Sequence, residues 1–234
     1  MIKSKVMSYA GKAHLAAGKR CQDYSFSCNI KGVTAVALAD GAGSASHAAD
    51  GAMIAAKTTC IHVCENFDRI YENENADKEK FFVIEAVRYA IENKYQTEDF
   101  ADFNSTLLCA AVKGDRCIIL HLGDGVVGRI SDSEEIFSVV SAPMNGLTRQ
   151  QTYLTGMKNA YMHLRLYRTD TKNLRSLILL TDGLAGDIFD FPAGVQRENV
   201  SADTVISGDC DSYFKELYSG DDDFSYAVIT VKGG

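Results

Sequence analysis

Four aspartates stand where predicted strands begin or end, and carboxylates in such places could bind a metal ion. They are Asp23, Asp40, Asp182 and Asp222. Residues 33–39 and 177–181 form apolar runs, and each run stops at an Asp-Gly pair. This composition predicts a buried strand that ends in a tight turn. Both runs therefore bring a carboxylate to a sheet edge, and hard divalent cations such as Mg²⁺ and Mn²⁺ prefer oxygen ligands of this kind.

Two helices are predicted directly after the Asp40 turn. Apolar residues recur at intervals of three and four over residues 48–67 and again over 81–95, and a polar stretch separates the two segments. This spacing is typical of amphipathic helices. We expect the first helix to begin near Ser46 and the two helices to pack as an antiparallel pair.

The later part of the chain has the pattern of strands. Short apolar runs separated by Gly and Asp predict a hairpin meander over residues 105–140. Its strands are expected at 105–112, 117–122, 126–131 and 135–140, with later strands at 176–180 and 226–231 and a short helix around 211–218. Blocks of strands and helices, rather than regular alternation, favour an α+β fold with antiparallel sheets covered by helix pairs.

Composition excludes several classes of protein. The chain has 234 residues, 46% of them hydrophobic, and only two prolines, which predicts a single domain over residues 1–234. The formal net charge of -7 argues against nucleic acid as a partner. The seven cysteines form no CxxC pair, and no stretch is long and apolar enough to span a membrane. We expect a cytoplasmic monomer with reduced thiols and no membrane partner.

Six short motifs occur in an order that resembles the metal-dependent protein phosphatase 2C family. The motifs are Gln22-Asp23, Asp40-Gly41-x-Gly43, Ser105-Thr106, Gly123-Asp124, Thr181-Asp182-Gly183-Leu184 and Asp222-Asp223-x-Ser225. Each motif alone is common, because Asp-Gly is an ordinary turn. Their order covers almost the whole chain and carries the resemblance. It implies a four-layer α/β/β/α sandwich, in which two central, mainly antiparallel sheets are flanked by helix pairs.

The resemblance also implies two Mn²⁺ or Mg²⁺ ions and a water that bridges them and attacks the phosphomonoester. Asp40 would bridge both ions, the backbone carbonyl of Gly41 would bind one, and Asp182 and Asp222 would bind the other. Asp23 would support the site through a metal-bound water. Paired ions invert the local charge, so an acidic site is compatible with a phosphate substrate.

Two of these assignments leave alternatives open. By resemblance, Asp124 would bind a third, weaker ion together with Asp182, but Gly123-Asp124-Gly125 could also be an ordinary turn. Three aspartates are consecutive at 221–223, and alignment on Phe224-Ser225 selects Asp222 as the ligand. A slip of one residue would make Asp223 the ligand instead.

The chain departs from the family pattern where phosphate is gripped. Many members carry an Arg five residues before the first Asp, and this chain has Gly18 there. Lys12, Lys19 or Arg20 could substitute, and Arg20 is ranked first because a guanidinium binds phosphate through two donors.

The chain also departs at two other positions. Gln22 replaces the more usual Glu, and Ala42 stands where eukaryotic members have a proton-donating His. Water or His47 would replace that donor, although the position of His47 favours a polar residue in the first turn of an exposed helix over a catalytic role.

These observations predict a metal-dependent serine/threonine phosphoprotein phosphatase. Its substrate would be a phosphorylated protein, and its partner would be a kinase. The segment 144–156 would be a short flap over the substrate, with Asn145, Thr148 and Arg149 in contact. Two alternatives stay open, a pseudophosphatase that acts as a binding module in phospho-signalling, and a phosphatase for a small metabolite.

Overall fold

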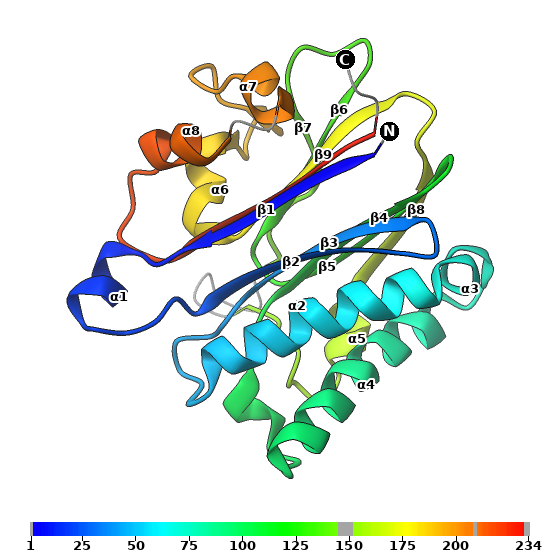
Figure 1. Cartoon of the computed structure of the whole chain (residues 1–234), viewed down its shortest axis with the longest axis vertical. Helices are drawn as coiled ribbons and strands as arrows, with labels where there is room; N and C mark the ends of the chain where they lie inside the picture. The colour runs from blue at the N-terminus through cyan, green and yellow to red at the C-terminus, as the bar shows by residue number, and fades with distance from the viewer. Residues whose placement is uncertain (1, 145–151, 208–209, 232–234) are drawn as a thin grey trace.

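The computed structural model describes residues 2–144, 152–207 and 210–231, which form two β-sheets between layers of helices (Figure 1). The five-stranded sheet has the order β2 (Asp23–Ile30), β3 (Val33–Asp40), β4 (Leu107–Lys113), β5 (Arg116–Leu122), β8 (Arg165–Asp170). The seven-stranded sheet has the order β1 (Lys3–Tyr9), β12 (Phe224–Thr230), β9 (Leu174–Leu180), β6 (Val126–Ser131), β7 (Ser138–Ser141), β11 (Val195–Gln196), β10 (Phe189–Asp190). Neighbouring strands run antiparallel throughout the described residues.

Helices cover the outer face of each sheet. The helices are α1 (Lys12–Ala16), α2 (Ala48–Glu65), α3 (Phe67–Glu72), α4 (Ala76–Tyr95), the 3-10 turn η1 (Phe100–Phe103), α5 (Ala160–His163), α6 (Asp182–Ile188), α7 (Ala202–Ser207) and α8 (Cys210–Leu217). In Figure 1, α2 and α4 lie against the five-stranded sheet, while α6, α7 and α8 lie on the far side of the other sheet. The four-layer α+β prediction is confirmed.

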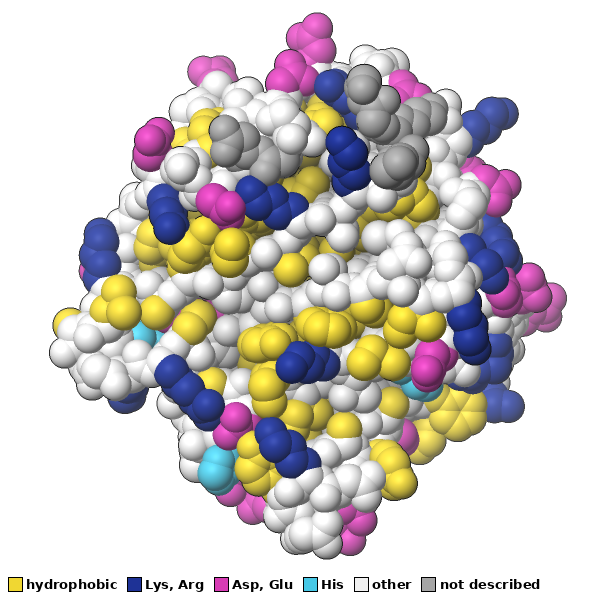
Figure 2. Space-filling model, viewed as in Figure 1, with side chains coloured by type: hydrophobic (Ala, Val, Ile, Leu, Met, Phe, Trp, Pro, Cys, Tyr) yellow, Lys and Arg dark blue, Asp and Glu magenta, His cyan; other side chains and the backbone are white. Residues whose placement is uncertain are grey.

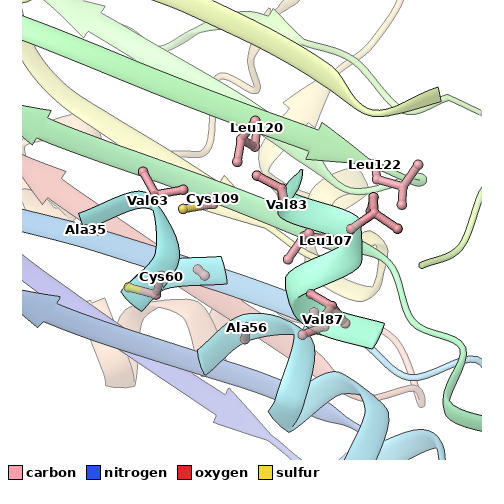
Figure 3. Packing of buried hydrophobic residues seen from close by; sticks show 14 of the residues in the cluster. Ala35, Ala56, Cys60, Val63, Val83, Val87, Leu107, Cys109, Leu120 and Leu122 are labelled. Atoms are coloured by element: carbon pink, nitrogen blue, oxygen red, sulfur yellow. The ribbon is translucent and has the colours of Figure 1, made fainter. Parts of the chain in front are cut away.

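The strand pattern explains why the layers form. In β3, Ala35, Ala37 and Ala39 pack under the helices, whereas Val36 and Leu38 face the second sheet. A strand buried on both faces reads as one continuous apolar run, as residues 33–39 do. β4 repeats the pattern, with Leu107 and Cys109 on the helix side, where Figure 3 shows them beside residues of α2 and α4.

The predicted helix pair is present, with shifted starts. α2 begins at Ala48, close to the expected Ser46, and α4 begins five residues earlier than the apolar pattern. Asn75 explains the earlier start, because its side chain caps the helix by accepting a hydrogen bond of 3.0 Å from the Lys78 backbone N–H. The polar stretch therefore contains a helix cap and the end of α3 rather than a loop alone.

The predicted meander over 105–140 is wrong. β4 and β5 form a hairpin in the five-stranded sheet, but β6 and β7 pair in the seven-stranded sheet. Gly123-Asp124-Gly125 is thus a crossing between sheets. Alternation along a strand shows which residues face the same side, but it does not show which sheet the strand joins.

Five strands were not predicted, and two of them, β10 and β11, are only two residues long. In β2, Tyr24, Phe26, Cys28 and Ile30 alternate with polar residues and pack against the helix-side core, so the signal was present in the sequence. β1 is an edge strand that begins with Lys3 and Lys5, and β8 is only half-buried. Edge strands bury less apolar surface and therefore give a weaker pattern.

Surface and thiol properties agree with the composition. Lys and Arg side chains are scattered over the face shown in Figure 2 rather than gathered in one patch. No disulfide bond links the cysteines within the described residues, and the Cys28 Sγ lies 3.2 Å from the Cys60 Sγ. Within the described ranges, no helix combines the length and the apolar character that crossing a membrane would require.

We predict that Gly51→Ala destabilises the protein. Gly51 is buried in α2, and a Cβ there would lie 2.1 Å from the Phe103 carbonyl oxygen of η1. Backbone must move to relieve this overlap, at a cost of roughly 1–3 kcal/mol. Thermal denaturation should show a lower melting temperature.

Gly186→Ala is the matched control. It also lies in a helix, α6, but nothing comes within 4 Å of its added Cβ. This variant should melt at the same temperature or higher, because alanine favours helix more than glycine does. Equal melting temperatures for Gly51→Ala and the control would contradict the close helix packing.

Candidate metal centre

Three carboxylates from three separate connections meet at one end of the sandwich. Asp40 ends β3, Asp124 lies in the crossing from β5 to β6, and Asp182 begins α6 after β9. Each offers an oxygen atom, and the three atoms lie within 4.8 Å of one another. The crossing between sheets is what brings Asp124 to the other two. Like charges this close repel each other unless a cation or protons neutralise them.

A fourth carboxylate, Asp23, lies beside this cluster. Asp23 and Asp40 face each other directly in the β2–β3 pair, and Asp23 is buried. The Thr181 hydroxyl donates a hydrogen bond of 2.7 Å to the Asp23 Oδ2 and accepts one of 2.8 Å from the Ser225 backbone N–H. Thr181 therefore fixes the orientation of Asp23 and joins the two sheets at this point.

The pKa values in this cluster are raised in the metal-free protein. Burial raises the pKa of Asp23 to about 7, with repulsion from Asp182 adding to the shift. Burial, followed by the charges of Asp23 and Asp182, raises the pKa of Asp40 well above its ordinary value. Burial within the cluster raises the pKa of Asp182 to about 6, and the charges of Asp124 and Asp222 contribute. The site thus resists holding four negative charges by itself.

The donor atoms fit a hard divalent cation. The cluster consists of carboxylate oxygens, which are the ligands that Mg²⁺ and Mn²⁺ prefer. The Asp124 Oδ1 is buried and has no hydrogen-bond partner, although burial of an unsatisfied acceptor is costly. Burial also raises the pKa of Asp124. An ion at this position would satisfy the unpaired oxygen and remove the repulsion.

Gly41 lies next to the cluster in a place that only glycine fits. Its N–H donates to the Gln22 carbonyl oxygen at 3.1 Å, and it forms an isolated bridge with Ser105. A Cβ on Gly41 would lie 2.5 Å from the Ala48 carbonyl oxygen at the start of α2. The use of its own carbonyl as a metal ligand stays a prediction.

The structure distinguishes the two neighbouring aspartates. Asp223 is buried and accepts hydrogen bonds from the Gly11 N–H at 2.7 Å, the Gln22 N–H at 2.5 Å and the His14 Nδ1 at 2.8 Å. Asp222 is exposed, and its charge raises the pKa of Asp182. Asp223 therefore holds the N-terminal segment in place. Asp222 offers its oxygen beside His14 and Asp223 rather than within the group of Asp40, Asp124 and Asp182, so its role as a ligand stays a prediction.

Arg20 and His47 meet elsewhere, at the first turn of α2. The Arg20 guanidinium lies 3.0 Å from the Asp50 carboxylate, and the His47 Nδ1 lies 4.0 Å from the same group. The His47 ring stacks on Phe103 with the ring centroids 4.9 Å apart. The recorded partners of Arg20 and His47 within the described chain include none of the clustered aspartates, so their roles with substrate stay predictions.

Of the other proposed substrate contacts, the structure describes Lys12 but not the three flap residues. Lys12 lies 3.9 Å from Asp221, and both side chains are largely exposed. Asn145, Thr148 and Arg149 lie outside the described residues. The flap prediction therefore stays a prediction.

Two residues support the backbone beside the cluster, and the sequence analysis assigned neither of them this role. The Thr106 hydroxyl accepts a hydrogen bond of 2.9 Å from the Asp40 N–H. The buried His121 donates from Nε2 to the Gly123 carbonyl at 3.1 Å and accepts at Nδ1 from the Ser141 hydroxyl at 2.9 Å. Burial lowers the pKa of His121 to about 3, so the ring is neutral and holds the crossing that carries Asp124. The available signal for His121 was a polar residue inside the apolar strand β5, whereas Thr106 lies directly before β4 in the Ser105-Thr106 motif.

Comparison with known structures supports the fold. A bacterial serine phosphatase superposes with a TM-score of 0.71 at 14% identity, covering 100% of this chain and 99% of that one. The S. agalactiae serine/threonine phosphatase gives 0.65 at 19% identity, covering 99% and 100%. RsbX in complex with magnesium gives 0.57 at 17% identity, covering 99% and 96%.

Sequence comparison gives the family. No curated protein matches the chain. A sequence model described as protein phosphatase 2C, however, matches residues 10–216, which include the clustered aspartates. The match covers most of the chain, and the motif order, the four layers and the acidic cluster agree with it. The chain belongs to the protein phosphatase 2C family.

Proposed function

We propose that this protein is a Mn²⁺- or Mg²⁺-dependent phosphatase that acts on phosphoserine and phosphothreonine in proteins. The convergence of Asp40, Asp124 and Asp182 in a member of this family carries the proposal. The similar structures support it, since two are described as serine or serine/threonine phosphatases and a third as a magnesium complex. A cytoplasmic location, a monomeric state and a partnership with a kinase stay predictions.

The ions would be held by the carboxylates that now repel one another. Asp40 would contact both ions, the Gly41 carbonyl one of them, and Asp182 and Asp222 the other, while Asp124 would contribute to a third, weaker site with Asp182. When bound, paired divalent ions lower the pKa of a water and offset the negative charge of the phosphate. Direct attack by that water would need no phosphorylated enzyme intermediate.

The chain's own residues would orient this chemistry. Thr181 fixes Asp23 through a 2.7 Å hydrogen bond, so Asp23 is held directly opposite Asp40 on the neighbouring strand. Thr106 fixes the backbone of Asp40, since its hydroxyl accepts from the Asp40 N–H and its own N–H donates 2.8 Å to the Asp40 carbonyl. Locked side chains hold a catalytic geometry better than mobile ones do.

We predict that Asp40→Asn and Asp182→Asn abolish metal-dependent turnover. Asparagine keeps the shape but removes the charge that would hold the ions, so the rate should fall by about 100-fold or more. The measurement is release of phosphate from p-nitrophenyl phosphate and from a phosphothreonine peptide, with Mn²⁺, Mg²⁺ or EDTA.

Asp203→Asn is the matched control for these variants. Asp203 is exposed and pairs with Arg175 at 2.9 Å, away from the cluster. It should keep the wild-type rate. Turnover that persists in EDTA, or that survives both cluster substitutions, would refute the metal-dependent mechanism. A folded protein without turnover of any phosphomonoester would instead indicate a binding module.

We also predict an unusual dependence of stability on pH in the metal-free protein. The folded-state pKa values of Asp23, about 7, and Asp182, about 6, lie above those of an unfolded chain. Between pH 4 and 7 the folded state therefore binds more protons than the unfolded state, and its stability falls as pH rises. In EDTA, the melting temperature should decrease from about pH 5.5 to 8.

Mn²⁺ should reverse this trend, because the ion competes with these protons and binds better as they leave. Asp40→Asn should melt higher than the wild type in EDTA at pH 8, since it removes one of the repelling charges. Two results would together contradict the repulsion: a wild-type melting temperature in EDTA that rises with pH, and a melting temperature of Asp40→Asn at pH 8 below that of the wild type.

A further inference from the structure

A cavity of about 590 Å³ adjoins the candidate metal centre. Its lining consists of Asp124, Ala142, Pro143, Asp182, Ala185, Gly186 and Phe191. Asp124 and Asp182 belong to the acidic cluster, so the cavity extends from the place where the phosphate would react. Whatever is attached to that phosphate would therefore lie at the mouth of this cavity.

The cavity is apolar away from the two aspartates. Ala142, Pro143 and Ala185 offer only aliphatic surface, and Phe191 keeps 38% of its surface exposed. The lining, as far as the described residues show it, contains no lysine or arginine that could pair with an acidic group. Large exposed aromatic side chains beside a reaction site commonly bind an apolar group of a ligand.

The walls of the cavity are fixed by hydrogen bonds. The Arg165 guanidinium donates 2.7 Å to the Ala142 carbonyl, and the Met144 N–H donates 2.9 Å to the Gly123 carbonyl. On the opposite wall, the Arg197 Nε donates 2.7 Å to the Gly186 carbonyl. A wall held in this way loses little conformational entropy when a ligand binds.

We propose that this cavity binds an apolar side chain next to the phosphoserine or phosphothreonine of a protein substrate. The inference rests on the proposed phosphatase activity and adds a substrate preference to it. Successive residues of a peptide lie 3.8 Å apart at Cα, so a flanking side chain reaches the cavity while the phosphate stays at the cluster. An acidic flanking residue would have to lose water against this aliphatic and aromatic surface, and the described lining holds no lysine or arginine to pair with it.

The test compares phosphothreonine peptides that differ only in the two residues flanking the phosphothreonine. One peptide carries leucine, another alanine and a third aspartate at these positions. The wild-type kcat/KM with Mn²⁺ should be about tenfold or more higher for the leucine peptide than for the aspartate peptide. N-acetylphosphothreonine amide, which has no flanking side chain, gives the basal rate.

Two variants change the cavity in opposite ways. Phe191→Ala removes its aromatic wall, and Gly186→Leu fills space, because nothing lies within 4 Å of a Cβ at that exposed helical position. Both should reduce the leucine preference at least severalfold, mainly by raising KM, and leave the rate on N-acetylphosphothreonine amide unchanged. Ile136→Ala is the control, because Ile136 is also an exposed large apolar residue but lies outside the cavity lining.

The outcomes separate the two proposals. Equal kcat/KM for the three peptides, or an undiminished leucine preference in both variants, would overturn the cavity assignment and leave the phosphatase proposal intact. Absence of metal-dependent turnover on every compound, including the amide, would overturn the phosphatase proposal and the cavity assignment with it. Gly186→Ala shows whether substitution at position 186 by itself affects folding.

Discussion

The repulsion among the clustered carboxylates limits how stable the whole fold can be. These carboxylates lie at the end of β3, between β5 and β6, and directly after β9. Asp40, Asp124 and Asp182 lie within reach of a single ion, and Asp23 is buried next to them. Such an arrangement disfavours the folded state unless the surrounding structure is stable enough to hold it. The two sheets supply that stability through a shared apolar layer that includes Val36, Leu38 and Leu179. An acidic cluster of this kind needs a large core, because its own interactions oppose folding unless cations or protons neutralise them.

Much of the fold could be predicted because its core strands are buried on both faces. Runs 33–39 and 177–181 predict strands that each deliver an aspartate. The first run forms β3 up to Asp40, and the second contains the last four residues of β9. The edge strand β1 gave no comparable signal, because none of its seven residues is fully buried. Assignment of β6 to the second sheet could not be predicted, since sheet membership depends on contacts between distant residues rather than on local pattern.

In the candidate site too, positions set by local sequence could be predicted, whereas positions set by contacts between distant residues could not. The positions of Asp40 and Asp182 followed from local sequence, because each aspartate follows an apolar run directly. The structural role of Asp223 did not, because it depends on the Gly11 and Gln22 N–H groups, which reach its side chain only in the folded chain. The pairing of Arg20 with Asp50 was likewise invisible, since the two residues meet only through the fold of the N-terminal segment.

The alanines on the helix side of β3 have a mechanical consequence. Small side chains at 35, 37 and 39 let α2 settle close to the sheet, and the Ala48 carbonyl at the start of that helix consequently lies against the Cα of Gly41. The start of α2 and the backbone of Gly41, beside the acidic cluster, are therefore in direct contact, and no side chain fits between them. A larger side chain at position 35, 37 or 39 would push α2 away from the sheet. The start of α2 would then move relative to Gly41, beside the acidic cluster.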